Sequence, residues 1–389
     1  MDVRDRGRAH NKVVEKIRKG GPLGFDSFME IALYSEQGFY SNSQPFGHAG
    51  DYFTSPTIHP IFGAMVAVQL WKIWKLLGKP IPFTVVESGS GNGLLARDII
   101  GCLEEFSEEI ASSLNYVAVD RIPISEPIEE ITSIVSTRLP QLSKVDVVLS
   151  NELLDAFPVK LIEIRCGRPY EILVGLGPNE ALIEITNNES LEDHEFFRLD
   201  LNLRDLEGYR GPIPMHMADW CQSVSDTLDR GFVLTIDYGF ERSQYYSMAR
   251  SNRLLQTYFQ HVDGLNPLDK VGDQDITSHV DFTTFREMSA ANGLKDVCSL
   301  SQREWLTNLH FTEIINANRE RGHISRRCLS LINNLVDPDG LGAFRVEIQS
   351  KGIGEVACED LFTDLRCVEN EWPIAPVTSR HMANELQKN

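Results

Sequence analysis

The sequence predicts an α/β fold whose core is a parallel β-sheet covered by helices on both faces. The main observation is an alternation of short β-branched runs with helical patterns, which is typical of parallel sheets. In addition, the first run ends in a glycine-rich turn that leads into a helical pattern, as at the carboxyl edge of open α/β sheets. The predicted strands are residues 83–87, 115–119, 145–150 and 231–236.

Residues 1–80 predict a helical segment that precedes this core, which we place at residues 81–350. Apolar residues recur at helical spacing in three stretches, residues 12–19, 27–33 and 60–77. We interpret the apolar residues of the third stretch as core. The sequence Gly50-Asp-Tyr-Phe-Thr-Ser-Pro56 has two open interpretations: a cover over a ligand pocket, with Thr54 as a binding residue, or a turn before the next helix.

Two segments interrupt the alternation and predict insertions, at about residues 159–213 and 240–280. The first contains runs of alternating apolar and polar residues separated by turn sequences, which predicts an antiparallel insertion. The second is polar, aromatic and rich in turn residues, which predicts a substrate-facing loop. Further patterns predict helices at 283–292 and 303–333 and a strand at 343–349. The pattern assigns no structure to the tail, residues 351–389.

The composition predicts a soluble protein with a sizeable core. Of 389 residues, 42% are hydrophobic, which is enough for one large domain or two. The formal net charge of −19 opposes non-specific binding to nucleic acids and docking to anionic membranes, because both need Lys and Arg near phosphate. This charge is compatible with a basic protein or peptide partner, although solubility alone is the simpler explanation.

The seven cysteines are scattered and form no C-x-x-C pair, so the sequence predicts reduced thiols. No apolar run is long enough to span a membrane. The charged start of the chain has no apolar signal core and makes a poor transit peptide. We therefore expect a cytoplasmic protein, or a mature protein of the mitochondrial matrix if the source is a eukaryote.

The glycine-rich turn follows the first predicted strand and reads Gly89-Ser-Gly-Asn-Gly93. Because glycine has no side chain, a ligand can approach the backbone N–H groups of such a turn closely. A dinucleotide-binding fingerprint would need glycine at position 94, where this chain has Leu94. A glycine turn that binds nothing remains the alternative. The candidate binding residues are Glu87, Gly89, Ser90, Gly91 and Gly93.

Acids and an amide follow the next two predicted strands. Asp120 ends the second strand, where a carboxylate can accept hydrogen bonds from ribose hydroxyls; the alternative is a simple turn residue. Asn151, Glu152 and Asp155 follow the third strand, where a carboxylate can orient or deprotonate a nitrogen nucleophile. Glu152 and Asp155 share a face if this segment is helical. The alternative is that Asn151 caps a short helix whose positive end the acids favour.

Two further polar positions carry weaker interpretations. Asp237 ends the fourth predicted strand and either contacts a substrate or terminates the strand. The stretch 273–282 concentrates acids around His279. Alternate positions on a strand point to opposite faces, and the stretch lacks a known ligand spacing, so we predict no metal site there. We interpret it instead as a polar substrate loop or as a helix N-cap.

Taken together, these segments resemble the MidA-like family of class I S-adenosylmethionine (SAM) methyltransferases. The family's pattern is matched in order by residues 38–47, 50–56, 62–63, 86–93, 150–158, 236–239, 275–282 and 341–344. The resemblance implies a Rossmann-like class I methyltransferase core, SAM as the cofactor, and a protein, peptide or small-molecule methyl acceptor. For the mitochondrial members, which include an assembly factor of respiratory complex I, it implies symmetric dimethylation of a protein arginine.

By matching position, the glycine turn would hold SAM and Asp120 would take the ribose position, where the family usually carries Glu. Asn151 would face the methyl donor, and the reaction centre would be lined by Asn151, Glu152 and Asp155. Ser90 and Asn92 stand where relatives usually carry Pro and Arg. We expect methylation of a nitrogen such as that of arginine. The alternatives are a small-molecule or peptide natural-product acceptor, a non-catalytic assembly factor and, more weakly, an NAD-dependent oxidoreductase; a homodimer is left open.

Overall fold

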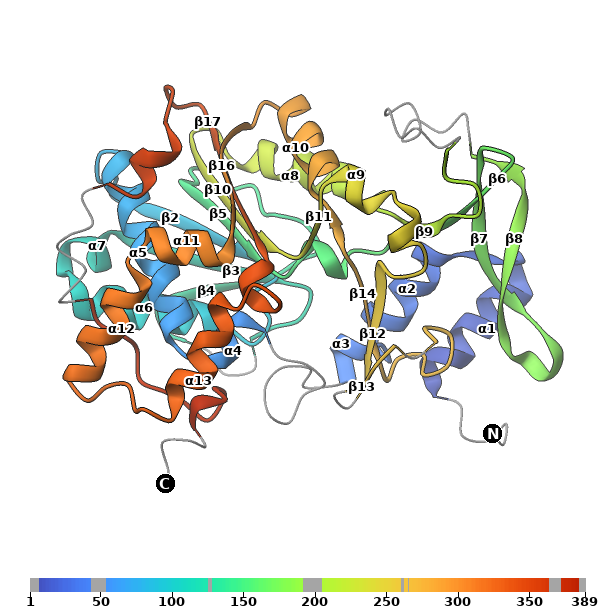
Figure 1. Cartoon of the computed structure of the whole chain (residues 1–389), viewed down its shortest axis with the longest axis horizontal. Coiled ribbons are helices and arrows are strands. Elements are labelled where there is room, and N and C mark those ends of the chain that lie inside the picture. Colours follow the sequence, from blue (N-terminus) through green and yellow to red (C-terminus); the bar gives the residue numbers. More distant parts are fainter. Residues whose placement is uncertain are drawn as a thin grey trace. The chain divides into compact units, whose positions relative to one another are not determined.

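The computed structural model describes residues 7–42, 54–124, 128–191, 205–259, 262–264, 266–363 and 372–384. The chain divides into two compact units, each built from separate stretches. The first comprises Met1–Tyr52, Leu154–Asp219 and Gly239–Glu287, and the second comprises Phe53–Leu153, Trp220–Tyr238 and Met288–Asn389. Each unit has its own main sheet (Figure 1). Each also has its own hydrophobic core.

The second unit holds, within the described residues, a seven-stranded sheet with the order β16-β17-β10-β5-β2-β3-β4. Its strands are β2 (Phe83–Ser88), β3 (Leu114–Asp120), β4 (Ile131–Val135), β5 (Val147–Asn151), β10 (Gly231–Asp237), β16 (Lys295–Ser301) and β17 (Arg345–Lys351). The predicted strands of the core are confirmed and pair in parallel, whereas β17 runs antiparallel to β10 and β16. The sequence does not predict β4 and β16, because these half-exposed edge strands carry a weak apolar pattern.

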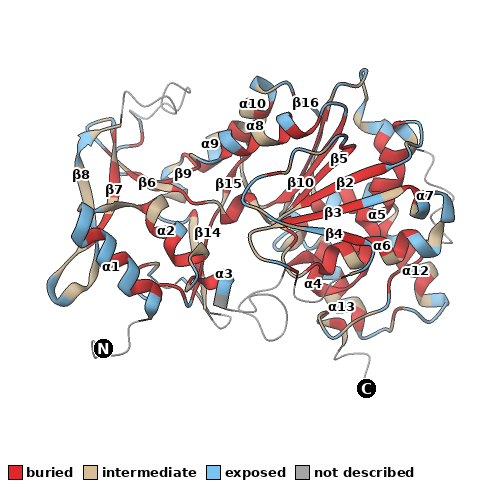
Figure 2. Ribbon diagram, turned by 180° about the vertical axis from the view of Figure 1, so that it is seen from behind, coloured by how far each residue is buried: buried red, intermediate tan, exposed pale blue. Residues whose placement is uncertain are grey.

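Buried runs place β2, β5 and β10 in the interior of this sheet (Figure 2). The helices of the unit are α4 (Ser55–Ile58), α5 (Ile61–Leu76), α6 (Leu94–Phe106), α7 (Glu108–Ser113), α11 (Gln302–Asn308), α12 (Phe311–Glu320) and α13 (Cys328–Asn333). Two more helices, α8 (Met217–Thr227) and α10 (Phe282–Ala291), begin in the first unit and end in the second. Within the described residues, no helix has both the length and the apolar character needed to cross a membrane.

Helix α5 is buried from Ile61 to Trp74, as its continuous apolar pattern predicts. It packs against α6, and the two helices approach closely at Gly63, where an added Cβ would come within 2.4 Å of Asp98 Cβ. The predicted helical stretch 303–333 is interrupted, because His310 and Gly322 both have positive φ. These left-handed residues end one helix and allow the chain to turn before the next.

The first unit contains, in its described part, a five-stranded antiparallel sheet with the order β1-β7-β6-β9, in which β8 also pairs with β7. The strands are β1 (Leu23–Gly24), β6 (Lys160–Arg165), β7 (Arg168–Leu176), β8 (Leu182–Ser190) and β9 (Arg210–Ile213). The predicted antiparallel insertion is therefore confirmed, and its sheet also includes β1 from the N-terminal segment. Helices α1 (Arg8–Gly20), α2 (Phe25–Tyr34) and α3 (Phe39–Asn42) belong to this unit, and α2 contacts β6 and β7.

The stretch 240–280 contains short strands where the sequence predicts only a loop. They are β11 (Gly239–Phe240) with its parallel partner β15 (Val280–Asp281), and β12 (Leu255–Phe259) with its antiparallel partners β13 (Val262–Asp263) and β14 (Asp275–Ser278). The sequence does not reveal these strands, because β14 is buried although most of its residues are polar. The substrate-facing role of this stretch stays a prediction. The remaining short elements are α9 (Arg242–Tyr245) and the 3₁₀ helices η2 (Leu154–Ala156), η3 (Pro178–Glu180), η6 (Met248–Arg250), η7 (Asn334–Val336), η8 (Leu341–Ala343) and η9 (Cys358–Leu361).

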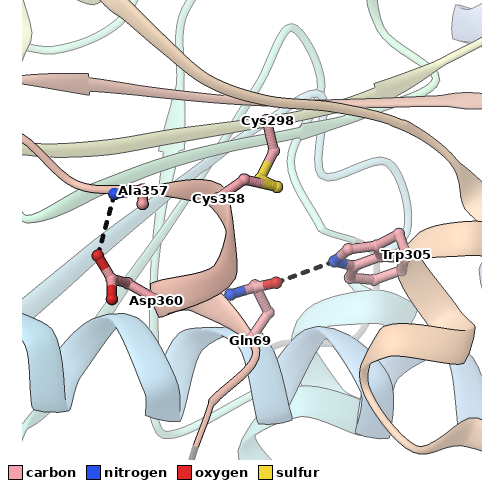
Figure 3. The surroundings of a disulfide bond; sticks show 6 residues. All are labelled: Gln69, Cys298, Trp305, Ala357, Cys358 and Asp360. Atoms are coloured by element: carbon pink, nitrogen blue, oxygen red, sulfur yellow. Dashed lines mark hydrogen bonds between the residues drawn. A yellow bond between two sulfur atoms is a disulfide. The ribbon is translucent and has the colours of Figure 1, made fainter.

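A disulfide joins the tail to the sheet of the second unit. Cys358, the first residue of η9, is bonded to Cys298 of β16 (Figure 3). Beside the bond, Ala357 N–H donates a hydrogen bond to Asp360 Oδ2 (3.0 Å), which caps the N-terminus of η9 (Figure 3). The prediction of reduced thiols is wrong for these two cysteines. Their separation of 60 residues leaves no local sequence signal for the pairing.

Removing this disulfide is expected to lower the free energy of unfolding by about 2–4 kcal/mol, since the bond closes a long loop in the unfolded chain. The test compares denaturant unfolding of the wild type, with and without reductant, with that of a variant carrying both Cys298→Ala and Cys358→Ala. The variant should unfold identically in the two conditions. A wild-type protein that keeps its stability in reductant would contradict the expectation.

Candidate functional site

The turn between β2 and α6, residues 89–93, is fixed by its backbone conformation. Gly89, Gly91 and Gly93 have φ of 74°, 53° and 75°. Residues with a side chain rarely adopt this region, so the turn requires its glycines. Gly93 N–H donates to Ser90 O (2.9 Å), and Gly89 N–H donates to Val119 O of β3 (2.9 Å). The strand, the glycine turn and the helix therefore follow one another as the sequence predicts.

Asp120 ends β3 beside this glycine turn. Its Oδ2 accepts a hydrogen bond from Gly91 N–H (2.8 Å), and its Oδ1 accepts one from Ile122 N–H (3.3 Å). Burial raises the pKa of Asp120, and the backbone N–H groups oppose that rise. The structure thus brings Asp120 to the turn and shows a contact that the sequence does not reveal: the carboxylate holds the middle glycine in place.

Glu87 precedes the turn on β2 and is only 2% exposed. Tyr116 of β3 donates its hydroxyl to Glu87 Oε2 (2.9 Å). Burial raises the pKa of Glu87 to about 8; the Tyr116 hydrogen bond opposes the rise and the charge of Asp120 adds to it. The carboxyl group is therefore mostly protonated at neutral pH. Sequence reasoning misses Tyr116, because an aromatic residue in a buried strand is first interpreted as core.

The raised pKa of Glu87 makes the protein's stability depend on pH. The folded state keeps this proton up to about pH 8, whereas the unfolded chain releases it near pH 4.5. The stability due to the proton is therefore present below pH 4.5 and is lost as pH rises through about 8. Glutamine has the shape of the protonated glutamate and does not titrate, so Glu87→Gln does not lose unfolding free energy in this way as pH rises. The variant's advantage in unfolding free energy is expected to grow by up to about 5 kcal/mol across that range.

This expectation is checked by urea unfolding of the wild type and of Glu87→Gln at a series of pH values. All other titrating groups are common to both proteins, so the difference between the two curves isolates Glu87. The exposed Glu109→Gln on α7 is the control and should follow the wild type. Parallel curves for wild type and Glu87→Gln would show that burial does not raise this pKa.

A second polar cluster follows β5, the strand next to β2. Asn151 ends β5, and Glu152 follows it with φ of 50°. Glu152 Oε1 accepts hydrogen bonds from Asn151 Nδ2 (3.1 Å) and from Ser55 N–H (3.1 Å). Ser55 begins α4, and the buried Thr54 is the N-cap of that helix. The end of the predicted pocket cover therefore contacts Glu152, while residues 50–53 of the cover lie outside the described residues.

Asp237 ends β10 and is fully buried. Its Oδ2 accepts a hydrogen bond from Leu153 N–H (3.2 Å), and its Oδ1 accepts one from Tyr238 N–H (2.8 Å). These contacts match the interpretation of Asp237 as a strand-terminating residue. Leu153 also lies against the glycine turn, because a Cβ added at Gly89 would come within 2.8 Å of its Cδ1. The segments that follow β2, β5 and β10 thus meet at one edge of the sheet.

Asp155 lies in the first unit, on η2, where it is buried. There, η2 contacts β14, and the Tyr34 hydroxyl donates to Ala156 O (2.6 Å). The positive φ of Glu152 prevents a continuous helical turn from Glu152 to Asp155, so the two acids do not share a helical face. The place of Asp155 in the reaction centre therefore stays a prediction.

The acidic stretch around His279 also belongs to the first unit. His279 Nδ1 is 3.0 Å from Leu254 O, and its ring stacks on Phe240. Burial lowers the pKa of His279. Within the described ranges, no group of three or more His, Cys, Asp and Glu side chains is placed to hold a metal ion.

Two buried side-chain atoms at the sheet edge have no hydrogen-bond partner among the described residues: Ser90 Oγ in the glycine turn and Asn151 Oδ1 at the end of β5. Leaving a buried polar atom unpaired costs roughly 1–3 kcal/mol, so such atoms suit a polar ligand. Together with the three glycines of the turn and the acids Asp120 and Glu87, these two atoms fit a ligand that carries a ribose and further hydrogen-bonding groups.

Comparison with known proteins points to the same kind of ligand. Residues 65–298 match a family described as "Putative S-adenosyl-L-methionine-dependent methyltransferase". The mitochondrial protein arginine methyltransferase NDUFAF7 homologue of Drosophila melanogaster is 27% identical over 317 residues, which cover 73% of this chain and 70% of the relative. The mitochondrial protein arginine methyltransferase NDUFAF7 of Bos taurus is 27% identical over 365 residues, which cover 85% and 80%.

The fold has a close counterpart among solved structures. A methyltransferase-like protein from Burkholderia thailandensis, solved bound to S-adenosyl-homocysteine, aligns with a TM-score of 0.79 at 24% identity over 92% of this chain and 94% of its own. This similarity confirms the predicted α/β fold. The family match covers more than half of the chain. The chain therefore belongs to the MidA-like family of SAM-dependent methyltransferases, which confirms the predicted enzyme class and cofactor.

Proposed function

We propose that the chain transfers the methyl group of SAM to an arginine nitrogen of a protein or peptide. The observation that carries this proposal is the carboxylate of Glu152, which Asn151 Nδ2 and Ser55 N–H hold at the same sheet edge as the glycine turn. Carboxylates bind the guanidinium group of arginine through paired, charge-assisted hydrogen bonds. The names of the curated relatives as protein arginine methyltransferases support the same acceptor.

The residues proposed to hold SAM are Glu87, Gly89, Ser90, Gly91, Gly93, Asp120, Asn151 and Thr54. SAM supplies a methyl group that its sulfonium already activates, so the protein mainly aligns donor and acceptor. The glycine turn offers its backbone to close approach, and Asp120 is assigned the ribose hydroxyls. Ser90 Oγ and Asn151 Oδ1 gain through the ligand the hydrogen bonds that the described protein does not provide.

In the proposed reaction, a nitrogen–carbon bond forms, the carbon–sulfur bond of the donor breaks, and the guanidinium loses one proton. Glu152 orients the guanidinium and accepts this proton. Asn151 supports the carboxylate through its Nδ2 hydrogen bond. Asp155 is assigned as the second acid of the reaction centre.

Ser90 and Asn92, which stand in the glycine turn where relatives usually carry Pro and Arg, do not favour another methyl acceptor. Asn92 Oδ1 accepts a hydrogen bond from Leu94 N–H (3.0 Å) and so satisfies a free N–H group at the start of α6. Ser90 is one of the residues proposed to bind SAM. Both residues therefore have a role within the turn. The names of the relatives as mitochondrial proteins support a mitochondrial location over a cytoplasmic one. The matrix as the compartment and a homodimer stay predictions.

The function is tested by incubating the protein and SAM with arginine-containing peptides and with matched peptides in which lysine replaces arginine. Intact-mass spectrometry should show methyl increments on the arginine peptides alone, and Glu152→Gln should remove them. Transfer only to a small molecule would overturn the arginine proposal. SAM binding without transfer to any acceptor would favour a non-catalytic assembly factor, and binding of NAD in place of SAM would contradict the proposal entirely.

A further inference from the structure

A segment of the tail, residues 372–384, packs on the second unit beyond the end of the family match at residue 298. Trp372 is fully buried, and its Nε1 donates to Ala64 O of α5 (3.1 Å). Cys102 Sγ of α6 contacts Pro373 O (3.0 Å). Met382 N–H donates to Thr57 O of α4 (2.8 Å). The segment therefore contacts three helices of the second unit, α4, α5 and α6.

Within this segment, Arg380 reaches the glycine turn itself. Its Nη1 donates to the backbone carbonyl of Asn92 (2.9 Å). Asn92 stands between Gly91 and Gly93, and its side-chain Oδ1 accepts from Leu94 N–H (3.0 Å). Asn92 is thus held through its side chain by the start of α6 and through its carbonyl by the tail.

The next residue, His381, ties the segment to α6. It is 2% exposed, and its Nδ1 accepts a hydrogen bond from Thr378 N–H (3.0 Å). This contact assigns the ring proton to Nε2, which donates to Asp98 Oδ2 (2.9 Å). Asp98 is buried on α6, shortly after the glycine turn. The pair anchors to α6 the backbone next to Arg380.

We infer that Arg380 is a positioning residue for SAM binding, which acts by holding the Asn92 peptide and with it the conformation of the glycine turn. A turn with three glycines has many accessible conformations, and fixing one before the ligand arrives lowers the entropic cost of binding. The inference rests on the proposed role of the glycine turn in SAM binding. It assigns to the tail, which lies beyond the family match, a part in holding the glycine turn.

The test measures the affinity of the full-length protein for S-adenosyl-homocysteine by isothermal titration calorimetry. Arg380→Met removes the donor and should weaken binding about tenfold. Arg380→Lys keeps a charged donor and should restore affinity to within about threefold of the wild type. The matched control is Arg319→Met on α12, where Arg319 donates a hydrogen bond to Asn316 of the same helix; the affinity of this variant should not change.

A steady-state assay separates positioning from general loss of structure. Arg380→Met should raise KM for SAM while kcat of the folded protein stays within about twofold. Wild-type affinity in Arg380→Met would overturn the inference, as would an affinity loss that Arg380→Lys does not repair. If Arg380→Met does not fold, Arg380→Gln is judged by the same criteria. Gly91→Val separates the two proposals. If Gly91→Val binds S-adenosyl-homocysteine as the wild type does, the assignment of the glycine turn to SAM binding fails. If Gly91→Val loses binding and Arg380→Met does not, only the inference on Arg380 fails.

Discussion

Replacing Gly91 with valine is expected to abolish SAM binding, with a loss of at least about a hundredfold in affinity. Gly91 has φ of 53°, a region that a β-branched residue strongly disfavours. Its N–H donates to Asp120 Oδ2, so a changed backbone at this position also breaks the contact between the turn and β3. The added side chain would occupy space that the proposed ligand needs for its approach to the backbone.

Calorimetric titration with S-adenosyl-homocysteine measures the effect, and thermal unfolding shows that the variant is folded. Gly101→Ala on α6 is the matched control, because its added Cβ would lie 3.5 Å from Ala375 Cβ, an ordinary contact. This variant should bind as the wild type does. Unchanged affinity in folded Gly91→Val protein would remove the glycine turn from the site.

The glycine turn can be predicted from sequence because all of its signals are local. The β-branched run, the alternate glycines and the helical spacing of the following leucines lie within one short stretch. Positive φ requires glycine, so the residue type itself reports the backbone geometry. The contacts that hold the turn are not local. The bonds of Tyr116 to Glu87 and of Gly91 to Asp120 depend on the pairing of β2 with β3, which periodicity does not specify.

The division into two units could not be predicted for the same reason. Leu23 pairs with Val174, so a strand of the N-terminal segment joins a sheet formed by the insertion. The buried strand β14 is rich in polar residues and carries no apolar alternation. Arg380 meets Asn92 only because Trp372 and its neighbours dock on α5 and α6. Each of these features is decided by tertiary packing, whereas sequence patterns report which face of a single element is buried.

Changing Glu152 to glutamine is expected to lower kcat by about a hundredfold or more, with the affinity for S-adenosyl-homocysteine kept within about threefold. Glu152 Oε1 accepts hydrogen bonds from Ser55 N–H and Asn151 Nδ2, and the amide oxygen of glutamine can accept both. The variant should therefore keep the contact between α4 and the end of β5. It lacks the negative charge that the proposed role requires for holding a guanidinium group and taking its proton.

Steady-state kinetics on an arginine peptide, together with calorimetry, decide between a chemical and a structural role for Glu152. Glu109→Gln is the control, since Glu109 forms an exposed pair with Lys79, and pairs of this kind contribute little to stability. If Glu152→Gln kept full kcat, its charge would take no part in transfer. If affinity and kcat fell together, Glu152 would serve mainly to hold α4 at the sheet edge. A fall in kcat alone assigns the carboxylate to the transition state, because interactions made only there change kcat and leave ground-state binding unaltered.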